Sequence, residues 1–338
     1  MNESGNIFPK VSIMIPTYNR AHYLPFAIES ALSQDYPNME IIVSDNCSTD
    51  NTAECMKKYL NDSRVRYYRN DNNMGSGPNY KKLLYEYAEG KYAKYLTDDD
   101  YLIDDEHISK AMKIITEYNV KIVFSAAVSR NEFEQYGINL SLGLDRLVKR
   151  EWWCKNFCKT HNGVNCFPSC GSGTVFNVSM AREWNACSGQ CYGDYELAIK
   201  CIFSESNTGY IKESSYVERR HPDQDGRTSF ENALNGSQIV NSIGKDDFNY
   251  GLDNKTLSEI RLRGIRFFVK GFLVQNWVSE NGKSIASFIG FLRALKTIDH
   301  RLPIKTLFDP QVVGRFIFNE TAIYSKLRNI LYDRFKEK

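Results

Sequence analysis

The chain has 338 residues, 42% of them hydrophobic, which is enough to bury a sizeable core and argues against a disordered or fibrous protein. Its 43 Lys and Arg residues nearly balance its 41 Asp and Glu residues. The resulting net charge of +2 is too small to indicate nucleic-acid binding across the whole surface, so we expect no nucleic-acid partner. The charge is uneven, because residues 257–338 contain 15 basic and 7 acidic side chains. This segment is a candidate for contact with something anionic.

Neither a signal peptide nor a membrane span is expected. Residues 1–10 contain no apolar segment, and no later stretch reaches roughly 18 uncharged apolar residues. We therefore expect a cytoplasmic location, in which the nine cysteines stay reduced. Six of them form C-x-x-x-C pairs, where free thiols are favoured over zinc because zinc sites usually use C-x-x-C spacing. The pairs are Cys154 with Cys158, Cys166 with Cys170, and Cys187 with Cys191.

Strand and helix patterns alternate along the first hundred residues. Short apolar runs predict strands, and apolar residues at helical spacing predict helices. The predicted strands are 11–15, 40–44, 65–68 and 92–96, and the predicted helices are 24–33, 52–60 and 80–88. This order predicts a doubly wound, mostly parallel α/β sheet flanked by helices.

The rest of the chain is mixed and then helical. Strands are predicted at 121–127 and 173–178, and helices at 194–203 and 261–278. We therefore predict three regions, which are the first half of an α/β domain over 8–117, its second half over 118–235, and a C-terminal helical appendage over 236–338.

Polar and acidic residues follow three of the predicted strands, at 16–20, 45–50 and 97–100. In doubly wound sheets the ligand lies beyond the carboxyl ends of the strands. The third segment contains three successive aspartates after the apolar strand YAKYL. Adjacent carboxylates repel one another, so three at a strand end indicate a divalent cation such as Mn2+ or Mg2+. Taken alone, a DDD sequence is more often a solvated turn.

Three motifs in order carry a family resemblance, namely VSIMIPTYN, IIVSDNCSTDNT and YLTDDDYL. Together they resemble the GT-A domain of family 2 glycosyltransferases, closely over residues 10–105 and more loosely to residue 225. The resemblance implies the GT-A fold, a nucleotide-sugar donor, and a metal-dependent transfer that inverts the anomeric centre.

The resemblance also places the donor nucleotide at the ends of the first two strands. Tyr18 is expected to pack against the base, and the neighbouring donor contacts are Pro16, Thr17 and Asn19. Asp45 is expected to accept a hydrogen bond from a ring N–H. Uracil and thymine present such an imide N–H, so a UDP sugar is favoured and a dTDP sugar is the alternative. In the competing interpretation this loop only caps the following helix.

The metal motif departs from the family's FLDxDD pattern, because Thr97 stands where the first Asp usually lies. A Thr-Asp-Asp form occurs in the family, and it assigns Asp99 to the cation and Asp98 to the ribose. Asp100 is then a supporting acid. Similarly, Asn46 stands where a second Asp is common.

Between these motifs, the loop NNMGSGPNY resembles the family's N-x-G-x-x-x-N variant, which borders the donor site. Asn73 and Asn79 are therefore candidate donor contacts. The two glycines of this loop are equally typical of an ordinary turn.

The catalytic base is expected in the second half. YGDYELAIK resembles the family's ED-Y-E-L element, which assigns the base to Asp194, with Gly193 in place of the usual Glu. The alternative role for Asp194 is an N-cap. Further on, the resemblance implies a loop that closes over the donor diphosphate, in which Arg220 would bind phosphate and His221 would bind the metal or the donor.

The C-terminal helix RLRGIRFFVKGFLVQNW is basic and aromatic. This composition suits an anionic membrane surface, and hence a polyprenyl-diphosphate-linked acceptor and a peripheral position on the inner face of the cell membrane. The alternatives are packing on the catalytic domain or on another subunit of a homo-oligomer.

We therefore predict an enzyme that transfers a hexose or N-acetylhexosamine from a UDP sugar to a hydroxyl of a surface glycan. Thr97 and Gly193, which replace acidic residues, leave a catalytically inert glycan-binding or scaffold protein as an alternative. A nucleotidyltransferase would need a glycine-rich phosphate loop that PTYNRAHYL lacks. A processive synthase would need membrane spans and a Q-x-x-R-W motif.

Overall fold

The structure, a computed structural model, describes residues 8–131, 137–161, 164–166, 171–187, 193–221 and 230–278. The chain divides into two compact units. Unit 1 is Met1–Gln224 with Phe248–Leu252, and unit 2 is Asp225–Asp247 with Asp253–Lys338. The predicted region 8–117 and most of 118–235 therefore fall within a single unit.

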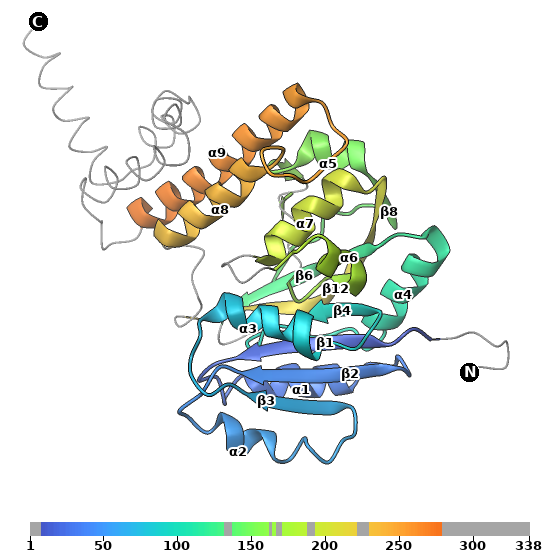
Figure 1. Ribbon diagram of the computed structural model, residues 1–338, viewed down its shortest axis with the longest axis vertical. Coiled ribbons are helices and arrows are strands. Elements are labelled where there is room, and N and C mark those ends of the chain that lie inside the picture. Colours follow the sequence, from blue (N-terminus) through green and yellow to red (C-terminus); the bar gives the residue numbers. More distant parts are fainter. Residues whose placement is uncertain are drawn as a thin grey trace, which may run out of the picture. The chain divides into compact units, whose positions relative to one another are not determined.

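The described part of unit 1 alternates strands and helices along much of its length (Figure 1). Its strands are β1 (Val11–Thr17), β2 (Met39–Asp45), β3 (Val65–Arg69), β4 (Tyr92–Tyr95), β5 (Tyr101–Leu102), β6 (Ile122–Asn131), β7 (Gly137–Asn139), β8 (Leu147–Lys149), β9 (Thr160–His161), β10 (Val164–Asn165), β11 (Val175–Asn177) and β12 (Asn207–Arg220). Its helices are α1 (Leu24–Leu32), α2 (Thr52–Met56), α3 (Ser76–Lys82), the π-helix η1 (Leu83–Tyr87), α4 (His107–Tyr118), α5 (Arg150–Asn156), α6 (Val178–Glu183) and α7 (Gly193–Ser204).

A mixed sheet forms the centre of unit 1, with the strand order β3-β2-β1-β4-β11-β6-β12-β5. The first four of these strands are mutually parallel, as the alternation of strand and helix signals predicted. β11 lies antiparallel between β4 and β6, whereas β6 and β12 are parallel. The predicted α/β class is therefore confirmed, with antiparallel members that the sequence did not indicate.

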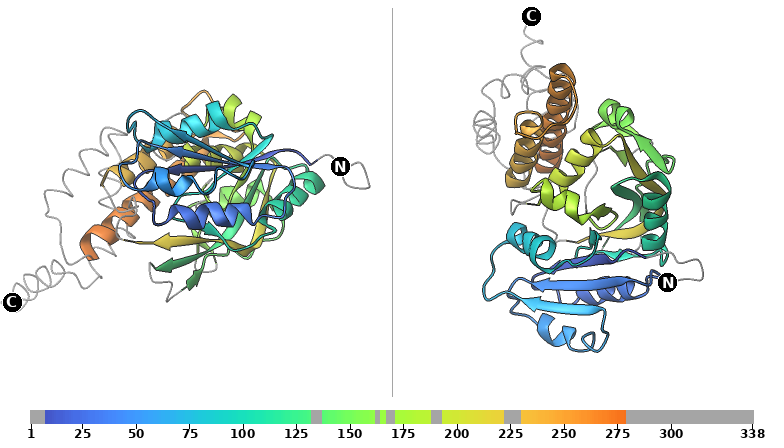
Figure 2. Two further views of the ribbon diagram at one scale, coloured as in Figure 1. Left: turned by 90° about the horizontal axis from the view of Figure 1, so that it is seen from below. Right: turned by 45° about the vertical axis from the view of Figure 1, so that its right-hand side comes forward.

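Helices cover both faces of the parallel strands (Figure 2). Every residue of β1 is buried, and the side chains of Val11, Ile13 and Ile15 join residues of α1 and α4 in one apolar core. On its other face β1 contacts α3 and η1. A strand buried on both faces needs apolar residues without alternation, which explains the continuous run VSIMI that marked it in the sequence.

Two predicted helices within the first hundred residues differ from the observed ones by several residues at one end. The helix predicted over 52–60 stops at Met56, and the chain continues in tight turns such as the bond from Tyr59 N to Met56 O. The helix predicted over 80–88 begins earlier, at Ser76, because Gly75 adopts a positive φ of 86° and Pro78 fits the first turn, whose N–H groups have no helical partner. It then widens into η1.

The 14-residue strand β12 connects distant parts of the site. Near its carboxyl end it pairs with β5, through Tyr216 with Leu102 and Val217 with Tyr101. Because β5 directly follows the acidic loop, which we define as residues 97–100, this pairing brings the end of β12 beside that loop.

The described part of unit 2 is a pair of helices, α8 (Phe230–Ser242) and α9 (Asn254–Val278). They approach closely, because a side chain on Gly236 would overlap Phe268 and one on Gly264 would overlap Val240. α9 confirms the helix predicted over 261–278, and residues 279–338 of the predicted helical appendage lie outside the described residues. Among the described helices, none has the combined length and apolarity needed to cross a bilayer.

Candidate active site

The three aspartates of the acidic loop are buried just beyond β4. The Asp100 carboxylate accepts hydrogen bonds from Ser172 Oγ at 2.6 Å and from the backbone N–H of Arg219 at 3.1 Å. Burial, reinforced by the negative charge of Asp99, raises the pKa of Asp98 and the pKa of Asp100 to about 7. The loop therefore concentrates acidic groups in a place where water screens them poorly.

Asp99 meets two basic side chains from distant parts of the chain. Arg20 Nη1 donates a hydrogen bond to Asp99 Oδ2 at 2.9 Å. His221 Nε2 lies 3.0 Å from the same oxygen and 3.1 Å from Arg20 Nη1. The structure thus brings together the two residues that the sequence assigned to the metal, and adds an arginine that contacts both of them.

The chemistry of this pair fits a divalent cation. The Nδ1 atom of His221 is buried without a hydrogen-bond partner among the described residues. The hydrogen-bonding capacity of the ring is therefore not fully used by these residues. A carboxylate oxygen and an imidazole nitrogen together suit Mn2+. Within the described part of the chain, however, no cluster of three or more His, Cys, Asp or Glu side chains is arranged around one point.

Beyond the end of β1, Tyr18 is exposed and Asn19 is held in place by a hydrogen bond. The Tyr18 side chain, 42% exposed, is open to a ligand, whereas Pro16 and Thr17 are buried. Asn19 adopts a left-handed φ of 54°, a conformation that asparagine tolerates better than most residues. Its Oδ1 accepts a hydrogen bond from Thr49 N at 2.7 Å, which ties the end of β1 to the loop after β2.

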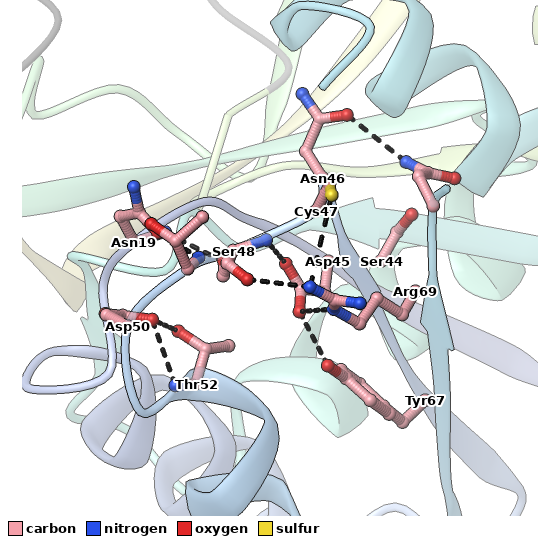
Figure 3. A network of polar contacts seen from close by, with 12 residues as sticks. Asn19, Ser44, Asp45, Asn46, Cys47, Ser48, Asp50, Thr52, Tyr67 and Arg69 are labelled. Atoms are coloured by element: carbon pink, nitrogen blue, oxygen red, sulfur yellow. Dashed lines mark hydrogen bonds and ion pairs between the residues drawn. The ribbon is translucent and has the colours of Figure 1, made fainter. Parts of the chain in front are cut away.

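Asp45, at the end of β2, is fully buried and already has several partners (Figure 3). Tyr67 Oη donates to Asp45 Oδ2 at 2.6 Å, and Ser48 N donates to Oδ1 at 2.8 Å. The half-exposed Arg69 has its Nε 3.6 Å from Oδ2. Donors from this region therefore already occupy both carboxylate oxygens, and a nucleobase would have to replace one of them.

The candidate donor contacts Asn73 and Asn79 belong to a cluster of amides that surrounds Asn46. Asn46 Nδ2 donates to Asn73 Oδ1 at 2.8 Å and to Gly75 O at 3.1 Å. Asn79 is buried, and its Oδ1 accepts hydrogen bonds from Ser44 Oγ at 2.6 Å and from Asn70 Nδ2 at 3.0 Å. Asn73 is exposed and accessible, whereas Asn79 serves the packing of the fold, so a donor contact for either remains a prediction.

Asp194, the predicted base, is partly exposed in the first turn of α7. Tyr80 on α3 interacts electrostatically with both Asp194 and the acidic loop. Burial first, and then the negative charges of Asp194 and of all three loop aspartates, raise the pKa of Tyr80 well above its usual value. Tyr80 therefore lies within the electrostatic reach of both the predicted base and the predicted metal site.

Arg220 is oriented differently from its neighbour His221. Its Nε donates to Ser129 Oγ at 2.7 Å, and its Nη2 lies 3.4 Å from Glu218 Oε1. Successive residues of a strand point to opposite faces, which accounts for the separation of Arg220 from the acidic loop. Its predicted phosphate contact stays a prediction.

Several candidate residues escaped the sequence-based prediction. Arg20 directly follows the motif PTYN, and its place just beyond a strand end was a signal available in the sequence. Ser172 and Arg219 had no such signal, because their partner Asp100 lies 72 and 119 positions away in the chain.

The cysteines that the structure describes are free thiols. Burial raises the pKa of Cys166 to about 11, which is typical of an inert buried thiol. Cys170 and Cys191 lie outside the described residues, so the second and third C-x-x-x-C pairs are each described in one member alone.

Comparison with protein families matches residues 12–168 to "Glycosyl transferase family 2". Among curated proteins, the chain is 30% identical over 116 residues to the poly(ribitol-phosphate) beta-N-acetylglucosaminyltransferase TarS of Staphylococcus aureus, covering 34% of this chain and 20% of that protein. It is 39% identical over 97 residues to the GalNAc(5)-diNAcBac-PP-undecaprenol beta-1,3-glucosyltransferase of Campylobacter jejuni, covering 28% of this chain and 31% of that protein. The matched segment thus spans less than a third of either relative.

Solved structures show the same fold. Residues 1–349 of S. aureus TarS, in complex with UDP-GlcNAc, superpose with a TM-score of 0.62 at 18% identity, covering 86% of this chain and 83% of that one. The mannosyltransferase PcManGT of Pyrobaculum calidifontis, in complex with GDP-Man and Mn2+, gives a TM-score of 0.52 at 13% identity, covering 93% and 88%. Residues 12–168 therefore match the model of glycosyl transferase family 2, as the motifs predicted, and the predicted GT-A fold is confirmed.

Proposed function

We propose that the protein is an inverting glycosyltransferase that moves a hexose or N-acetylhexosamine from a UDP sugar to a hydroxyl of a glycan or lipid-linked glycan in surface polysaccharide biosynthesis. The observation that carries the proposal is the meeting of Asp99, Arg20 and His221 beside the carboxyl ends of β1 and β4. An acidic loop balanced by basic side chains at this edge of a doubly wound sheet is suited to a nucleotide diphosphate.

In this proposal the nucleotide lies across the ends of β1 and β2. The exposed ring of Tyr18 stacks on the base, and Asp45 accepts the imide N–H of uracil after Arg69 moves aside. Asp98 binds the ribose. The same imide group is present in thymine, so a dTDP sugar is the alternative donor. Support for UDP comes from the GT-A neighbour that is solved with UDP-GlcNAc, whereas the neighbour solved with GDP-Man represents another donor class.

The proposed enzyme uses Mn2+ or Mg2+, which Asp99 and His221 would hold. When bound, the cation supplies positive charge to the leaving diphosphate. Arg20 provides part of that charge from the protein itself, because its guanidinium already lies against Asp99 and carries further N–H groups that suit a phosphate.

Asp194 is the proposed base. Its carboxylate takes the proton from the acceptor hydroxyl while the acceptor oxygen forms a bond to the anomeric carbon and the bond from that carbon to UDP breaks. A displacement in a single step places the acceptor and the leaving group on opposite faces of the sugar, and therefore inverts the anomeric centre.

We further propose that the enzyme works in the cytoplasm, at the inner face of the cell membrane. The relative from C. jejuni has an undecaprenol-linked substrate in its name, which supports a lipid-linked acceptor. α9 contributes Arg261, Arg263 and Arg266 in its first half, and such residues favour an anionic lipid surface. Flotation of the full chain with vesicles of anionic and of neutral lipid tests this; equal recovery with both would contradict it.

A screen of UDP, dTDP and GDP sugars tests the proposed donor. Each is added to the full chain with Mn2+, and thermal stabilisation and donor hydrolysis are measured. We expect a UDP sugar to stabilise the protein and to be hydrolysed when Mn2+ is present but not when it is chelated. Stabilisation without hydrolysis in any acceptor mixture would favour the inert binding protein, and a response to dTDP or GDP sugars alone would overturn the donor assignment.

A further inference from the structure

The guanidinium of Arg219, near the end of β12, is enclosed by three aromatic rings. Its Cζ lies 5.0 Å from the ring centroid of Tyr23, 4.6 Å from that of Phe26 and 5.1 Å from that of Tyr101. Tyr23 is the N-cap residue of α1, Phe26 lies in the first turn of that helix, and Tyr101 belongs to β5. We call these three rings the Arg219 cage. A buried arginine that is stabilised by aromatic faces fixes the strand that carries it.

The cage is joined directly to His221. Arg219 lies in β12 and His221 directly follows that strand, and both side chains project toward Tyr23 beside α1. The ring of Tyr23 contacts both of them, because its centroid is 4.7 Å from that of His221. The backbone N–H of Arg219 also donates to Asp100 in the acidic loop. One residue therefore ties together the aromatic ring beside His221 and the loop that contains Asp99.

The other contacts of the His221 ring among the described residues would hold it less firmly. Its Nε2 contacts Asp99 and Arg20, the two groups expected to rearrange when the donor binds, and its Nδ1 has no hydrogen-bond partner among the described residues. Because the ring of Tyr23 packs at a tilt of 40° against that of His221 and also forms a wall of the cage, the position of the imidazole depends on the cage remaining closed.

We propose that Arg219 and its aromatic cage act as a positioning unit that holds His221 against Asp99 in readiness for the cation. This inference rests on the proposed function for the role of His221, but the placement of the ring can be tested without metal or donor. Arg219 itself touches neither the metal nor the sugar in this proposal, and it acts through His221.

The test opens the cage from its exposed side. Phe26 is 51% exposed, so Phe26→Ala removes one ring without emptying the core. Leu60→Ala is the matched control, because Leu60 is an apolar residue of similar exposure, 48%, located beyond α2. Phe26→Trp retains an aromatic face and serves as the conservative variant. Arg219→Met removes the charge at the centre of the cage while keeping much of its length.

The first measurement uses histidine labelled with 13C in the full, metal-free chain. The chain contains five histidines, and the signal of His221 is identified by its loss in His221→Ala. We expect the His221 signal to shift and broaden in Phe26→Ala and Arg219→Met, and to stay unchanged in Leu60→Ala and Phe26→Trp. An unchanged His221 signal in folded Phe26→Ala would overturn the proposal, whether or not the protein proves to be a glycosyltransferase.

The second measurement is a double-mutant cycle on the Kd for Mn2+, followed by the EPR signal of the free ion. Loss of one cation–π contact should weaken Mn2+ binding about three- to tenfold in Phe26→Ala. In the His221→Ala background the same change should alter the Kd less than about twofold, because the positioned residue is gone. Equal losses in both backgrounds would overturn the positioning role. If the wild-type chain itself did not bind Mn2+, the proposed metal dependence would fail instead, and the histidine signals would still decide the positioning role.

Discussion

Polar side chains at the ends of β2 and β12 differ in how far along the chain their hydrogen-bond partners lie. At the end of β2, the side chains of Asp45 and Asn46 find partners 3 to 29 positions away in the chain. At the end of β12, His221 lies against Asp99 and Arg20, which are 122 and 201 positions away. The comparison indicates that the side of the site proposed for the nucleotide is assembled by neighbouring segments, whereas the side proposed for the metal and diphosphate depends on the fold of the whole unit.

The largest effect is expected on the side of the site that depends on the whole fold, when the charge of Asp99 is removed. Asp99→Asn leaves Arg20 and His221 without their shared carboxylate, so we expect donor binding and turnover to be lost together, with turnover falling about 1000-fold or more. Mn2+-dependent hydrolysis of a UDP sugar measures this. Asp71→Asn, an exposed aspartate near β3, is the control and should behave as wild type. Hydrolysis that survives in Asp99→Asn would refute the role of the acidic loop.

A second variant separates chemistry from binding. Asp194→Asn keeps the shape of the side chain but removes the proposed base, so we expect transfer to an acceptor to fall about 100- to 10,000-fold. Thermal stabilisation by UDP and Mn2+ should remain close to that of wild type, because Asp194 contacts neither in the proposal. Loss of nucleotide binding in this variant would show that Asp194 serves the fold and not the reaction.

The side of the site that is built by neighbouring segments, at the end of β2, is tested at Asn46, where the family often has Asp. Asn46→Asp should reduce the free energy of unfolding by about 2–4 kcal/mol, because a buried carboxylate would replace the amide that donates to Asn73 Oδ1 and Gly75 O. Urea denaturation measures the loss. Asn72→Asp adds the same charge at an exposed position of the same loop, and equal stability of the two variants would contradict the argument.

The smallest expected effect concerns Lys94, on the strand that leads into the acidic loop. Its side chain is fully buried, its Nζ has no hydrogen-bond partner among the described residues, and burial lowers its pKa to about 7 from its usual 10.5. Between these two values the unfolded chain binds the proton and the folded chain does not, so this group makes stability rise with pH by up to ~1.4 kcal/mol per pH unit.

The corresponding measurement compares urea denaturation of wild type and Lys94→Met at pH 7.5 and at pH 9. We expect the variant to be the more stable protein at pH 7.5 and to gain less stability than wild type as the pH rises. A pH dependence that is unchanged in Lys94→Met would mean that the ammonium group is solvated or paired in the folded state.

Much of the fold could be predicted because its signals are local. The strands of the first hundred residues lie where short apolar runs placed them, since a strand buried on both faces requires such a run. Helix ends were less predictable. The early start of α3 depends on the positive φ of Gly75, and the early stop of α2 depends on turn hydrogen bonds that no periodicity reveals.

For the site, the sequence by itself determined which strand ends carry polar residues, because the motifs PTYN, SDNCSTD and TDDD are contiguous. Only the tertiary structure decided that Arg20, Arg219 and Ser172 join them. The physical reason lies in β12, whose pairing with β6 shifts register twice between Ile211 and Tyr216. A shift of one residue turns every following side chain to the other face of the sheet, so the alternation of the sequence could not show that Arg219 and His221 face α1 while Arg220 faces away.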